Sequence, residues 1–391
     1  MTVNDLLDGL APIGRVPATS GYRRFAWTPV DSELRRWFSD QAVARGLRVE
    51  KDRNANLWAF LGDSGPHELI AVGSHLDSVA DGGAFDGPLG IASAFAALDL
   101  LQERGLRPDR TVAIVLFHEE EGARFGVPCL GSRLLTGAID PDRARSLTDA
   151  EGHTLADAMT EVGEHPDRLG PDLDRARRVS TFVELHIEQG RALVDLGQPI
   201  AIGSEIWPHG RWRLDFQGIA NHAGTTLMED RVDPTERFAT TLLRVLEGAR
   251  RTGTRATFGR LQVTPNSTNA IPSQVTAWLD ARAGDQADLE VLIDSIGDDA
   301  VVTAESISER VEFDRDLRNQ LQEVLGQVPV LATAAGHDAG VLSAAGIATA
   351  MLFVRNPTGI SHSPAESATR QDCLAGTEAL AMVLTDLATF H

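Results

Sequence analysis

The sequence contains almost no cysteine and has fewer basic than acidic residues. Only Cys129 and Cys373 occur among its 391 residues, which excludes a disulfide framework and a thiolate metal cluster. Lys and Arg number 36 against 56 Asp and Glu, and the net charge of −20 argues against nucleic acid or an anionic membrane surface as partner. No apolar run approaches the roughly 20 residues that span a bilayer, and the first residues lack the pattern of a signal peptide. We therefore expect a soluble, cytoplasmic protein, long enough for two domains.

Short β-rich runs alternate with longer helical patterns, an order that favours an α/β fold built on a sheet. Buried strands are predicted at 68–74, 110–117, 179–185 and 348–354. Helices are predicted at 89–105 and 337–346, each closed by a glycine that suits a C-terminal cap. The acidic stretch 149–170 is typical of a solvated helical excursion.

From about Arg211 the pattern changes to a β-α-β-β-α-β order, the ferredoxin-like supersecondary arrangement. The segments that indicate this order are 211–218, 233–250, 257–266, 274–284, 287–300 and 305–313. We therefore predict an inserted lid domain at 209–313 and a first domain made of 1–208 and 314–391.

Polar side chains gather where four of the predicted strands end. The clusters are His75 with Asp77, His118 with Glu119–Glu121, Glu184 with His186 and Glu188, and, further along, Ser361 with His362 and Ser363. Open α/β sheets bind ligands at the carboxyl ends of their strands. Imidazoles and carboxylates without cysteine form a nitrogen/oxygen site suited to zinc, manganese or cobalt. A lone histidine after a strand is more often a packed or exposed residue, but four such clusters favour a metal site.

The loop GSHLDSVADGGAFDGPLG (73–90) supplies three candidate residues. His75 is a candidate ligand, and Asp77 is a carboxylate able to orient its ring. Asp86 can offer its two oxygens to two metals, and the flanking glycines let backbone approach it closely. The alternative is that Asp86 caps the following helix.

The run HEEEGARF (118–125) places three adjacent carboxylates after a strand. Like charges this close repel, so one of them should have a raised pKa unless a cation neutralises the group. A metal bound by one carboxylate leaves a neighbour free to act as general base toward water whose pKa falls to ~7. The alternative is an acidic, solvated turn.

The motifs taken together resemble those of the di-metal M20-type amidohydrolases. The resemblance is to the branch of N-carbamoyl-L-amino acid amidohydrolases, β-ureidopropionases and allantoate amidohydrolases. It runs from end to end, through GYRRFAWTPVD, GSHLDSVADGGAFDG, EEGARF, ELHIEQG, ANHAGTT, NAIP and GISHSPAE. It implies a metallopeptidase-like catalytic domain with a mixed central sheet, and an inserted α+β domain that serves as lid and makes a homodimer.

The resemblance also implies the roles of individual residues. One ion is expected on His75, Asp86 and His186, and a second ion on Asp86, Glu121 and His362. The general base falls on Glu120, and Glu119 has no direct role. The ions expected are zinc or manganese, with cobalt or nickel possible.

The substrate residues implied are Gln189, His222, Asn269 and Arg282. His222 is expected to reach the partner's active site and to stabilise the oxyanion, and Arg282 suits a substrate carboxylate. Alternatives are a surface salt bridge for Arg282 and a turn role for Asn269. The roles of Asn221, Thr226, Arg231 and His337, which lie in matching motifs, are left open.

Some residues depart from the family pattern and could alter substrate choice. They are Leu227 after NHAGTT, and Arg355 and Asn356 near His362. At the start of the predicted lid, Trp207, His209 and Trp212 could reshape the lid entrance.

The function expected is metal-dependent hydrolysis of a ureido group on a small carboxylic acid, either an N-carbamoyl-L-amino acid or allantoate. The lid is expected to close over the substrate. The nearest alternative is an aminopeptidase or deacylase with the same metals. A binding protein that kept the fold and a purely structural metal site are further alternatives, which Glu120 and the absence of cysteine ligands disfavour.

Overall fold

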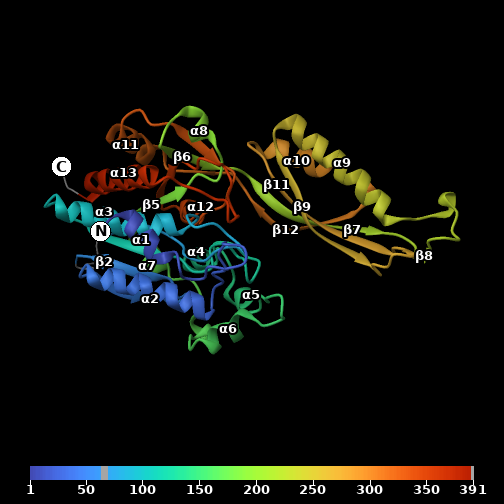
Figure 1. The fold of residues 1–391 in the computed structure, drawn as a ribbon, viewed down its shortest axis with the longest axis horizontal. Coiled ribbons are helices and arrows are strands. Elements are labelled where there is room, and N and C mark those ends of the chain that lie inside the picture. Colours follow the sequence, from blue (N-terminus) through green and yellow to red (C-terminus); the bar gives the residue numbers. More distant parts are fainter. Residues whose placement is uncertain (63–68, 389–391) are drawn as a thin grey trace. The chain divides into compact units, whose positions relative to one another are not determined.

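The computed structural model describes residues 1–62 and 69–388 and divides into two compact units (Figure 1). Unit 1 comprises Met1–Ser204 together with the residues from Glu312 onward, and unit 2 comprises Glu205–Val311. The sequence placed the corresponding boundaries at 209 and 313, and the function of unit 2 as a lid stays a prediction. Among residues 1–62 and 69–388, no helix is both long and apolar enough to cross a bilayer.

Unit 1 is built on a nine-stranded mixed sheet with the order β1-β2-β4-β3-β5-β15-β6-β13, in which β14 also pairs with β6. The central strands β4, β3, β5 and β15 run parallel, whereas β2 and β6 join antiparallel at either side. The strands are β1 (Arg48–Lys51), β2 (Leu57–Leu61), β3 (Leu69–Ser74), β4 (Thr111–Leu116), β5 (Val179–Ile187), β6 (Ile200–Ile206), β13 (Val311–Glu312), β14 (Val330–Thr333) and β15 (Ala348–Val354). The central strands are nearly continuous apolar runs because helices cover both of their faces. The predicted mixed α/β fold is confirmed, and of the strand predicted at 68–74 only residue 68 lies outside the described residues.

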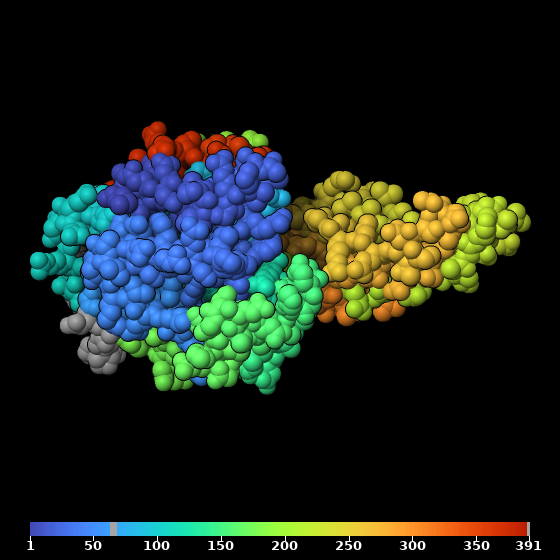
Figure 2. Space-filling model, turned by 60° about the horizontal axis from the view of Figure 1, so that its bottom comes forward, coloured from blue at the N-terminus to red at the C-terminus, as the bar shows by residue number. Residues whose placement is uncertain are grey.

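One layer of helices shares its apolar core with this sheet. It contains α1 (Val3–Leu10), α2 (Pro29–Ala44), α3 (Pro88–Glu103), α11 (Arg315–Leu325) and α13 (Arg370–Ala388). Helix α3 is apolar on nearly every side, so it is buried throughout its first three turns. Helix α1 packs against α3 and α13, and Figure 2 shows the N-terminal residues beside the C-terminal helix.

The remaining helices of unit 1 are short. They are α4 (Leu130–Thr136), α5 (Pro141–Arg145), α6 (Leu155–Glu161), η1 (Pro166–Arg168), α7 (Leu173–Arg178), α8 (Ala192–Leu196) and α12 (Asp338–Ala344). The prediction of a solvated helical excursion at 149–170 is only partly right. Leu155, Met159 and Leu169 are buried with Phe125 and Leu134, so this acidic stretch anchors a satellite core.

Unit 2 has a four-stranded antiparallel sheet with the order β12-β7-β11-β9, covered on one face by α9 and α10 (Figure 1). The elements are β7 (His209–Gln217), α9 (Pro234–Thr252), β9 (Arg255–Thr264), β11 (Gln274–Arg282), α10 (Gln286–Asp294), η3 (Gly297–Asp299) and β12 (Val301–Ser308). A two-stranded extension pairs β8 (Asn221–His222) with β10 (Ala270–Ile271), and η2 (Met228–Asp230) follows β8. This order is the β-α-β-β-α-β arrangement that the sequence predicts.

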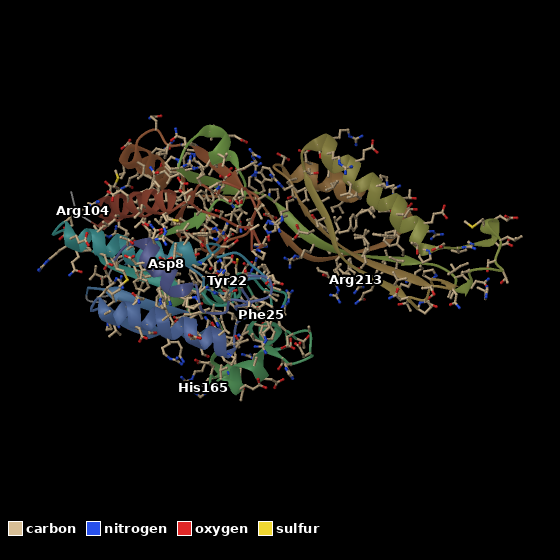
Figure 3. All side chains as sticks on the ribbon, in the orientation of Figure 1. Asp8, Tyr22, Phe25, Arg104, His165 and Arg213 are labelled. Carbon is tan, nitrogen blue, oxygen red and sulfur yellow. The ribbon has the colours of Figure 1, made fainter. Side chains whose placement is uncertain are left out.

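Alternation along β7 and β11 gives the unit 2 sheet one apolar and one polar face. Leu214, Phe216 and Leu279 are buried with residues of α9 and α10. On the other face, Arg213 pairs with Asp215 at 2.9 Å, and Figure 3 places Arg213 on the side away from α9.

Two sequence expectations for unit 2 are wrong. The strand expected at 305–313 is two elements, because β12 begins at Val301 and β13 belongs to the unit 1 sheet. Trp212 is buried in the core of unit 2, so its side chain is not placed to reshape a lid entrance.

Candidate metal centre

The predicted metal ligands lie at the carboxyl ends of neighbouring strands in unit 1. His75 follows β3, Glu121 follows β4, His186 is near the end of β5, and His362 follows β15. Asp86 lies on the loop that leads into α3. Because these strands are parallel neighbours, residues far apart in sequence meet at one edge of the sheet.

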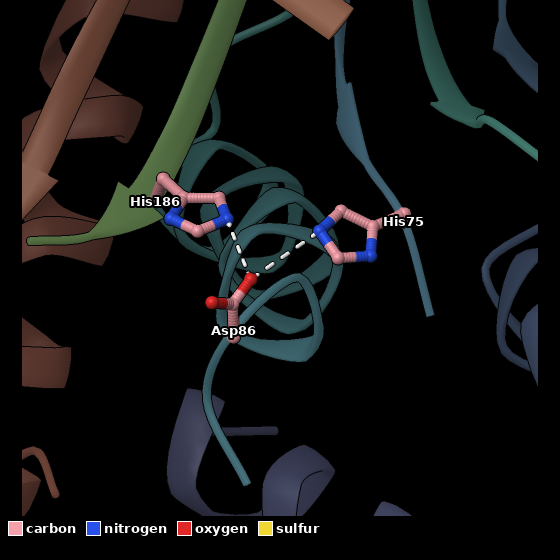
Figure 4. Close-up of side chains that lie close together, drawn as sticks. All are labelled: His75, Asp86 and His186. Atoms are coloured by element: carbon pink, nitrogen blue, oxygen red, sulfur yellow. Dashed lines mark ion pairs between the residues drawn. The ribbon is translucent and has the colours of Figure 1, made fainter. Parts of the chain in front are cut away.

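Two histidines and one aspartate form a first buried donor group. The Nε2 atoms of His75 and His186 lie 3.5 and 3.2 Å from the same oxygen, Oδ1 of Asp86 (Figure 4). The Nδ1 atoms lie 3.1 Å from the carbonyl oxygen of Asp77 and 2.9 Å from that of Ile187. Because these carbonyls accept from Nδ1–H, Nε2 of each ring is the nitrogen that would bind a cation beside Asp86.

The first group fits a divalent cation. His75 and His186 are each only 1% exposed, and within the described chain their Nε2 atoms have no hydrogen-bond partner. A buried polar atom without a partner is costly, and a bound cation would satisfy both nitrogens together with the Asp86 carboxylate. The three donor atoms lie within 4.8 Å of one another.

A second donor group uses the other oxygen of Asp86. Nε2 of His362 lies 3.5 Å from Oδ2 of Asp86 and 3.4 Å from Oε2 of Glu121. This group is more open, because the His362 side chain is 49% exposed while Asp86 is buried. One carboxylate therefore faces two donor groups with different oxygens. Asp86 does not cap the helix, since α3 begins at Pro88 and its N-cap residue is Gly87, with no side-chain cap bond from the described residues.

A third set of donors, Glu184, His186 and His337, is close enough together for a metal but is tied into the fold. The Glu184 carboxylate accepts from the Ser74 hydroxyl at 3.0 Å and from the Ala339 N–H at 3.0 Å. Glu184 therefore joins β5 to β3 and to the start of α12 beneath the first donor group.

The charged groups of the centre perturb one another strongly. Burial alone would lower the pKa of His75. The carboxylates of Glu120, Asp77 and Asp86 raise it by more, so the pKa of His75 lies well above its usual value. Burial alone would raise the pKa of Asp86, but His186 and His75 beside it hold that pKa well below its usual range. Burial and, to a smaller extent, the negative charge of Asp86 raise the pKa of Glu121 well above its usual value. A cluster that retains protons on some groups is one from which a divalent cation would displace them.

Glu120 is placed as a candidate base beside the first donor group. Its Oε2 is 3.6 Å from Nε2 of His75, and its Oε1 accepts from the Cys129 thiol at 3.3 Å. Burial raises the pKa of Glu120 well above its usual value, and the neighbouring carboxylates of Asp338, Glu121 and Asp77 add to this effect. A raised pKa suits a group that must take a proton and return it near neutral pH.

Asp77 acts mainly on the backbone of the acidic run. Its carboxylate accepts from the N–H groups of Glu120 at 3.2 Å and Glu121 at 3.0 Å. The closest Asp77 acceptor to the His75 ring is its carbonyl oxygen, since Oδ1 is 3.6 Å away. The carbonyl oxygen is thus the closer partner of the ring, and the orienting role that the sequence assigned to the Asp77 carboxylate stays a prediction.

Glu119 has a structural place, consistent with the expectation of no direct role. Its Oε1 accepts from the N–H groups of Arg124 at 3.2 Å and Phe125 at 3.1 Å. Burial, followed by the charge of Asp77, raises the pKa of Glu119 to about 8.

Three side chains contact Asp86 or its backbone in addition to the histidines. Gln189, which the resemblance assigns to substrate, donates from Nε2 to Oδ2 of Asp86 at 2.8 Å. Ser361 donates to the same oxygen at 2.9 Å, and Glu366 accepts from the Asp86 N–H at 3.0 Å. The sequence reasoning did not assign Ser361 or Glu366 a role, although both lie in the GISHSPAE motif.

His222 and Asn269 come together in unit 2, on the β8–β10 pair. Ala270 pairs with His222, and the Ala223 N–H donates to the Asn269 carbonyl at 3.1 Å. The Gly224 N–H donates to Nδ1 of His222 at 3.0 Å, so the neutral ring carries its proton on Nε2.

Arg231 and Arg282 also have defined contacts in unit 2. Arg231 donates from Nη2 to the carbonyls of Ala223 at 2.7 Å and Thr226 at 3.1 Å, which braces the loop after His222. Arg282 donates to both oxygens of Asp280, at 2.8 and 3.2 Å, the ion pair that was its alternative assignment. The roles of His222, Asn269 and Arg282 toward a substrate stay predictions.

Other singled-out residues are held by structural contacts. His118 pairs through Nε2 with Asp31 at 2.8 Å. Arg355 pairs with Asp372 at 2.7 Å, and Asn356 donates to the Ile360 carbonyl at 2.8 Å. Arg355 and Asn356 thus shape the loop before His362.

The fold and this nitrogen/oxygen donor set define a metallohydrolase of the M20 type. Residues 71–386 match the model of the Peptidase family M20/M25/M40, and the chain belongs to this family. The resemblance inferred from the motifs is therefore confirmed at the level of the family, for which divalent-metal binding is implied.

The comparisons also give particular relatives. The chain is 36% identical over 397 residues to N-carbamoyl-L-amino acid amidohydrolase of Geobacillus stearothermophilus, covering 95% of this chain and 94% of that protein. It is 33% identical over 406 residues to allantoate amidohydrolase of Escherichia coli (strain K12), covering 99% and 97%. Among solved structures, the crystal structure of AtUAH in complex with glyoxylate has a TM-score of 0.87 at 27% identity, covering 99% of this chain and 97% of that chain.

Proposed function

We propose that this protein is a divalent-metal-dependent amidohydrolase that cleaves the ureido group of a small carboxylic acid and releases ammonia and carbon dioxide. The observation that carries the proposal is the carboxylate of Asp86, whose two oxygens face two donor groups beside the buried Glu120. The relatives named for N-carbamoyl-L-amino acids and for allantoate support the substrate class, because both compounds carry a ureido group near a carboxylate.

Two ions would be held, one by His75, Asp86 and His186 and the other by Asp86, Glu121 and His362. Imidazole and carboxylate donors suit zinc or manganese, and also cobalt or nickel. Ions at these positions would supply Lewis-acid polarisation of the ureido carbonyl and acidification of water.

Glu120 supplies the proton transfers. It accepts a proton from the attacking water and later delivers that proton to the leaving nitrogen, so a single buried carboxylate serves both half-reactions. The thiol of Cys129 on Oε1 leaves Oε2, the oxygen nearer His75, for this exchange.

His222 supplies a hydrogen bond to the oxyanion. With Nδ1 accepting from Gly224, the proton on Nε2 is available for donation without a change of tautomer. A donor already oriented toward developing charge stabilises the transition state more than the substrate.

Arg282 recognises the substrate carboxylate. Its planar guanidinium already binds both oxygens of one carboxylate, Asp280, in the geometry that a substrate carboxylate would need. Binding therefore exchanges Asp280 for substrate, and the two carboxylates compete.

We also propose a homodimer, because His222 and Arg282 of one chain are too far apart to contact one small substrate. Strand β11 has nine residues, from Gln274 beside the β8–β10 pair to Arg282, and spans about 27 Å. A carbamoyl amino acid is about 7 Å long, the length of two extended residues. The partner's His222 would therefore complete the site that contains Arg282.

An exposed edge of unit 2 supports the dimer. Strand β9 is at the edge of the sheet and largely exposed, and Leu261 on it and Leu243 on α9 are exposed apolar side chains. In the described sheet β9 pairs with β11 on one side only, and such an open strand edge with apolar neighbours is a template for a second chain.

The test is ammonia release by protein reconstituted with manganese or zinc. We expect turnover of N-carbamoyl-L-amino acids or of allantoate, and little cleavage of N-acyl amino acids or dipeptides. Cleavage of acyl or peptide substrates with no ammonia from either ureido compound would instead assign the protein as a deacylase or aminopeptidase.

A further inference from the structure

We infer that Glu366 is a positioning residue that fixes the bridging carboxylate of Asp86 and thereby sets the affinity of both metal sites. The inference rests on the proposed function, since it assumes that Asp86 binds metal. Glu366 lies on the loop between β15 and α13 and is only 6% exposed. Its Oε2 accepts from two consecutive backbone N–H groups, of Phe85 at 2.7 Å and of Asp86 at 3.0 Å.

The same carboxylate also reaches the side chain of Asp86 through Ser361. The Ser361 hydroxyl is 2.9 Å from Oδ2 of Asp86 and 3.3 Å from Oε1 of Glu366. A hydroxyl has one proton but two acceptor lone pairs, so it donates to one of these oxygens at a time. Glu366 therefore binds the backbone of Asp86 directly. It also lies beside the Ser361 hydroxyl, and so restricts the position of the hydroxyl that binds the Asp86 carboxylate.

The glycines of the loop provide an independent sign that this contact is built in. A Cβ on Gly83 would lie 2.1 Å from Oε2 of Glu366, so the carboxylate occupies the space of a side chain. Gly87 has a φ of 83°, and a Cβ there would lie 2.5 Å from Cε1 of His75. The absence of a side chain at Gly83 leaves room for Glu366, and the absence of one at Gly87 leaves room for the ring of His75. Steric fit therefore explains these two glycines of the loop.

The arrangement matters for metal binding because Asp86 faces both donor groups. A small rotation of its carboxylate would move one oxygen away from His75 and His186 and the other away from Glu121 and His362. Loss of a residue that orients a metal ligand typically weakens metal affinity by about 10–100-fold.

The experiment compares metal binding by chelator-stripped, full-length variants. Manganese and zinc are titrated by calorimetry and by competition with a coloured chelator, and folding is checked by circular dichroism. Glu366→Ala should weaken binding by about 10–100-fold. Glu366→Gln should stay close to wild type, because its carbonyl oxygen still accepts both N–H groups and its amide can donate to Ser361. Glu378→Ala is the matched control, since Glu378 pairs with Arg104 on an exposed face of α13.

The outcomes separate this inference from the proposed function. Wild-type metal affinity in Glu366→Ala would overturn the positioning role of Glu366. Metal affinity as low in Glu366→Gln as in Glu366→Ala would also overturn it, because the effect would then come from the charge of Glu366. If Glu366→Ala does not fold, Glu366→Asp decides: its shorter side chain should bind metal more weakly than Glu366→Gln, and the reverse order overturns the inference. A wild-type protein that binds no divalent ion would refute the proposed metal centre itself.

Discussion

Two inactive variants, Glu120→Gln and His222→Ala, should restore activity to each other when they share a dimer. Glu120 belongs to unit 1, whereas His222 belongs to the β8–β10 extension of unit 2. Strand β11, about 27 Å long, lies between the β8–β10 pair and Arg282 within unit 2. In the proposed dimer the partner's His222 completes the site, so we expect each active site to take Glu120 from one chain and His222 from the other.

The expected recovery follows from counting intact sites. In a mixed dimer, the chain with His222→Ala keeps its Glu120 and receives an intact His222 from its partner, so one of the two sites works. Equal amounts that exchange freely give about half mixed dimers, and hence about one quarter of wild-type activity. Alone, Glu120→Gln should lose about 10²–10⁴-fold in kcat and His222→Ala about 10²–10³-fold.

The assay is ammonia release after the variants are mixed, dissociated and reassembled, with different affinity tags to isolate the mixed dimers. The control is a mixture of Glu120→Gln with the double variant, in which no site can be intact. If isolated mixed dimers are as inactive as the separate variants, His222 serves its own chain and the composite-site argument is wrong.

Three further predictions concern single residues. Glu120→Gln should retain the wild-type metal content measured by plasma emission, and loss of metal would show that Glu120 is a ligand and not only a base. Arg282→Lys should raise KM on the order of 10-fold for a carboxylate substrate and much less for the corresponding amide. Asp280→Asn should instead lower KM, because it removes the carboxylate that competes with the substrate for Arg282. Equal effects of Arg282→Lys on the acid and on the amide would contradict the assignment. Burial and, to a smaller extent, the negative charge of Asp86 raise the pKa of Glu366 to about 7, so the folded metal-free protein holds a proton that the unfolded chain releases near pH 4.5. The free energy of unfolding should therefore fall by up to about 3 kcal/mol as the pH rises between these two values. A melting temperature that rises from pH 5 to pH 8 would contradict this.

The clusters of polar residues could be predicted from the sequence because most of them lie at the end of a strand with a clear apolar run. β3, β4 and β5 are buried along nearly their whole length, so polar residues at their ends stand out, and parallel neighbours must align those ends. The assignment of each histidine to Asp86 came from the family resemblance, because the strand pattern alone does not say which donors share an ion.

Contacts between distant loops could not be predicted in the same way. Glu366 and Gly83 are far apart in sequence, and nothing in the local pattern of either indicates that one fills the space beside the other. The atom of Asp77 that meets the His75 ring depends on the local turn, which composition does not determine.

An edge strand and a stretch that mixes charged and apolar residues account for the remaining wrong predictions. Strand β12 is exposed along nearly its whole length, so it lacks the alternation that marks where a strand begins and ends. The acidic stretch 149–170 buries Leu155 and Met159 beneath its charged residues, and the charges obscured this short apolar pattern.

The most direct test of the account is the number and position of divalent ions in crystals of the manganese-loaded protein, measured by anomalous scattering. We predict two ions per chain, one beside His75 and His186 and one beside Glu121 and His362, with Asp86 bound to both. A single ion, or ions bound away from Asp86 in a correctly folded chain, would contradict it.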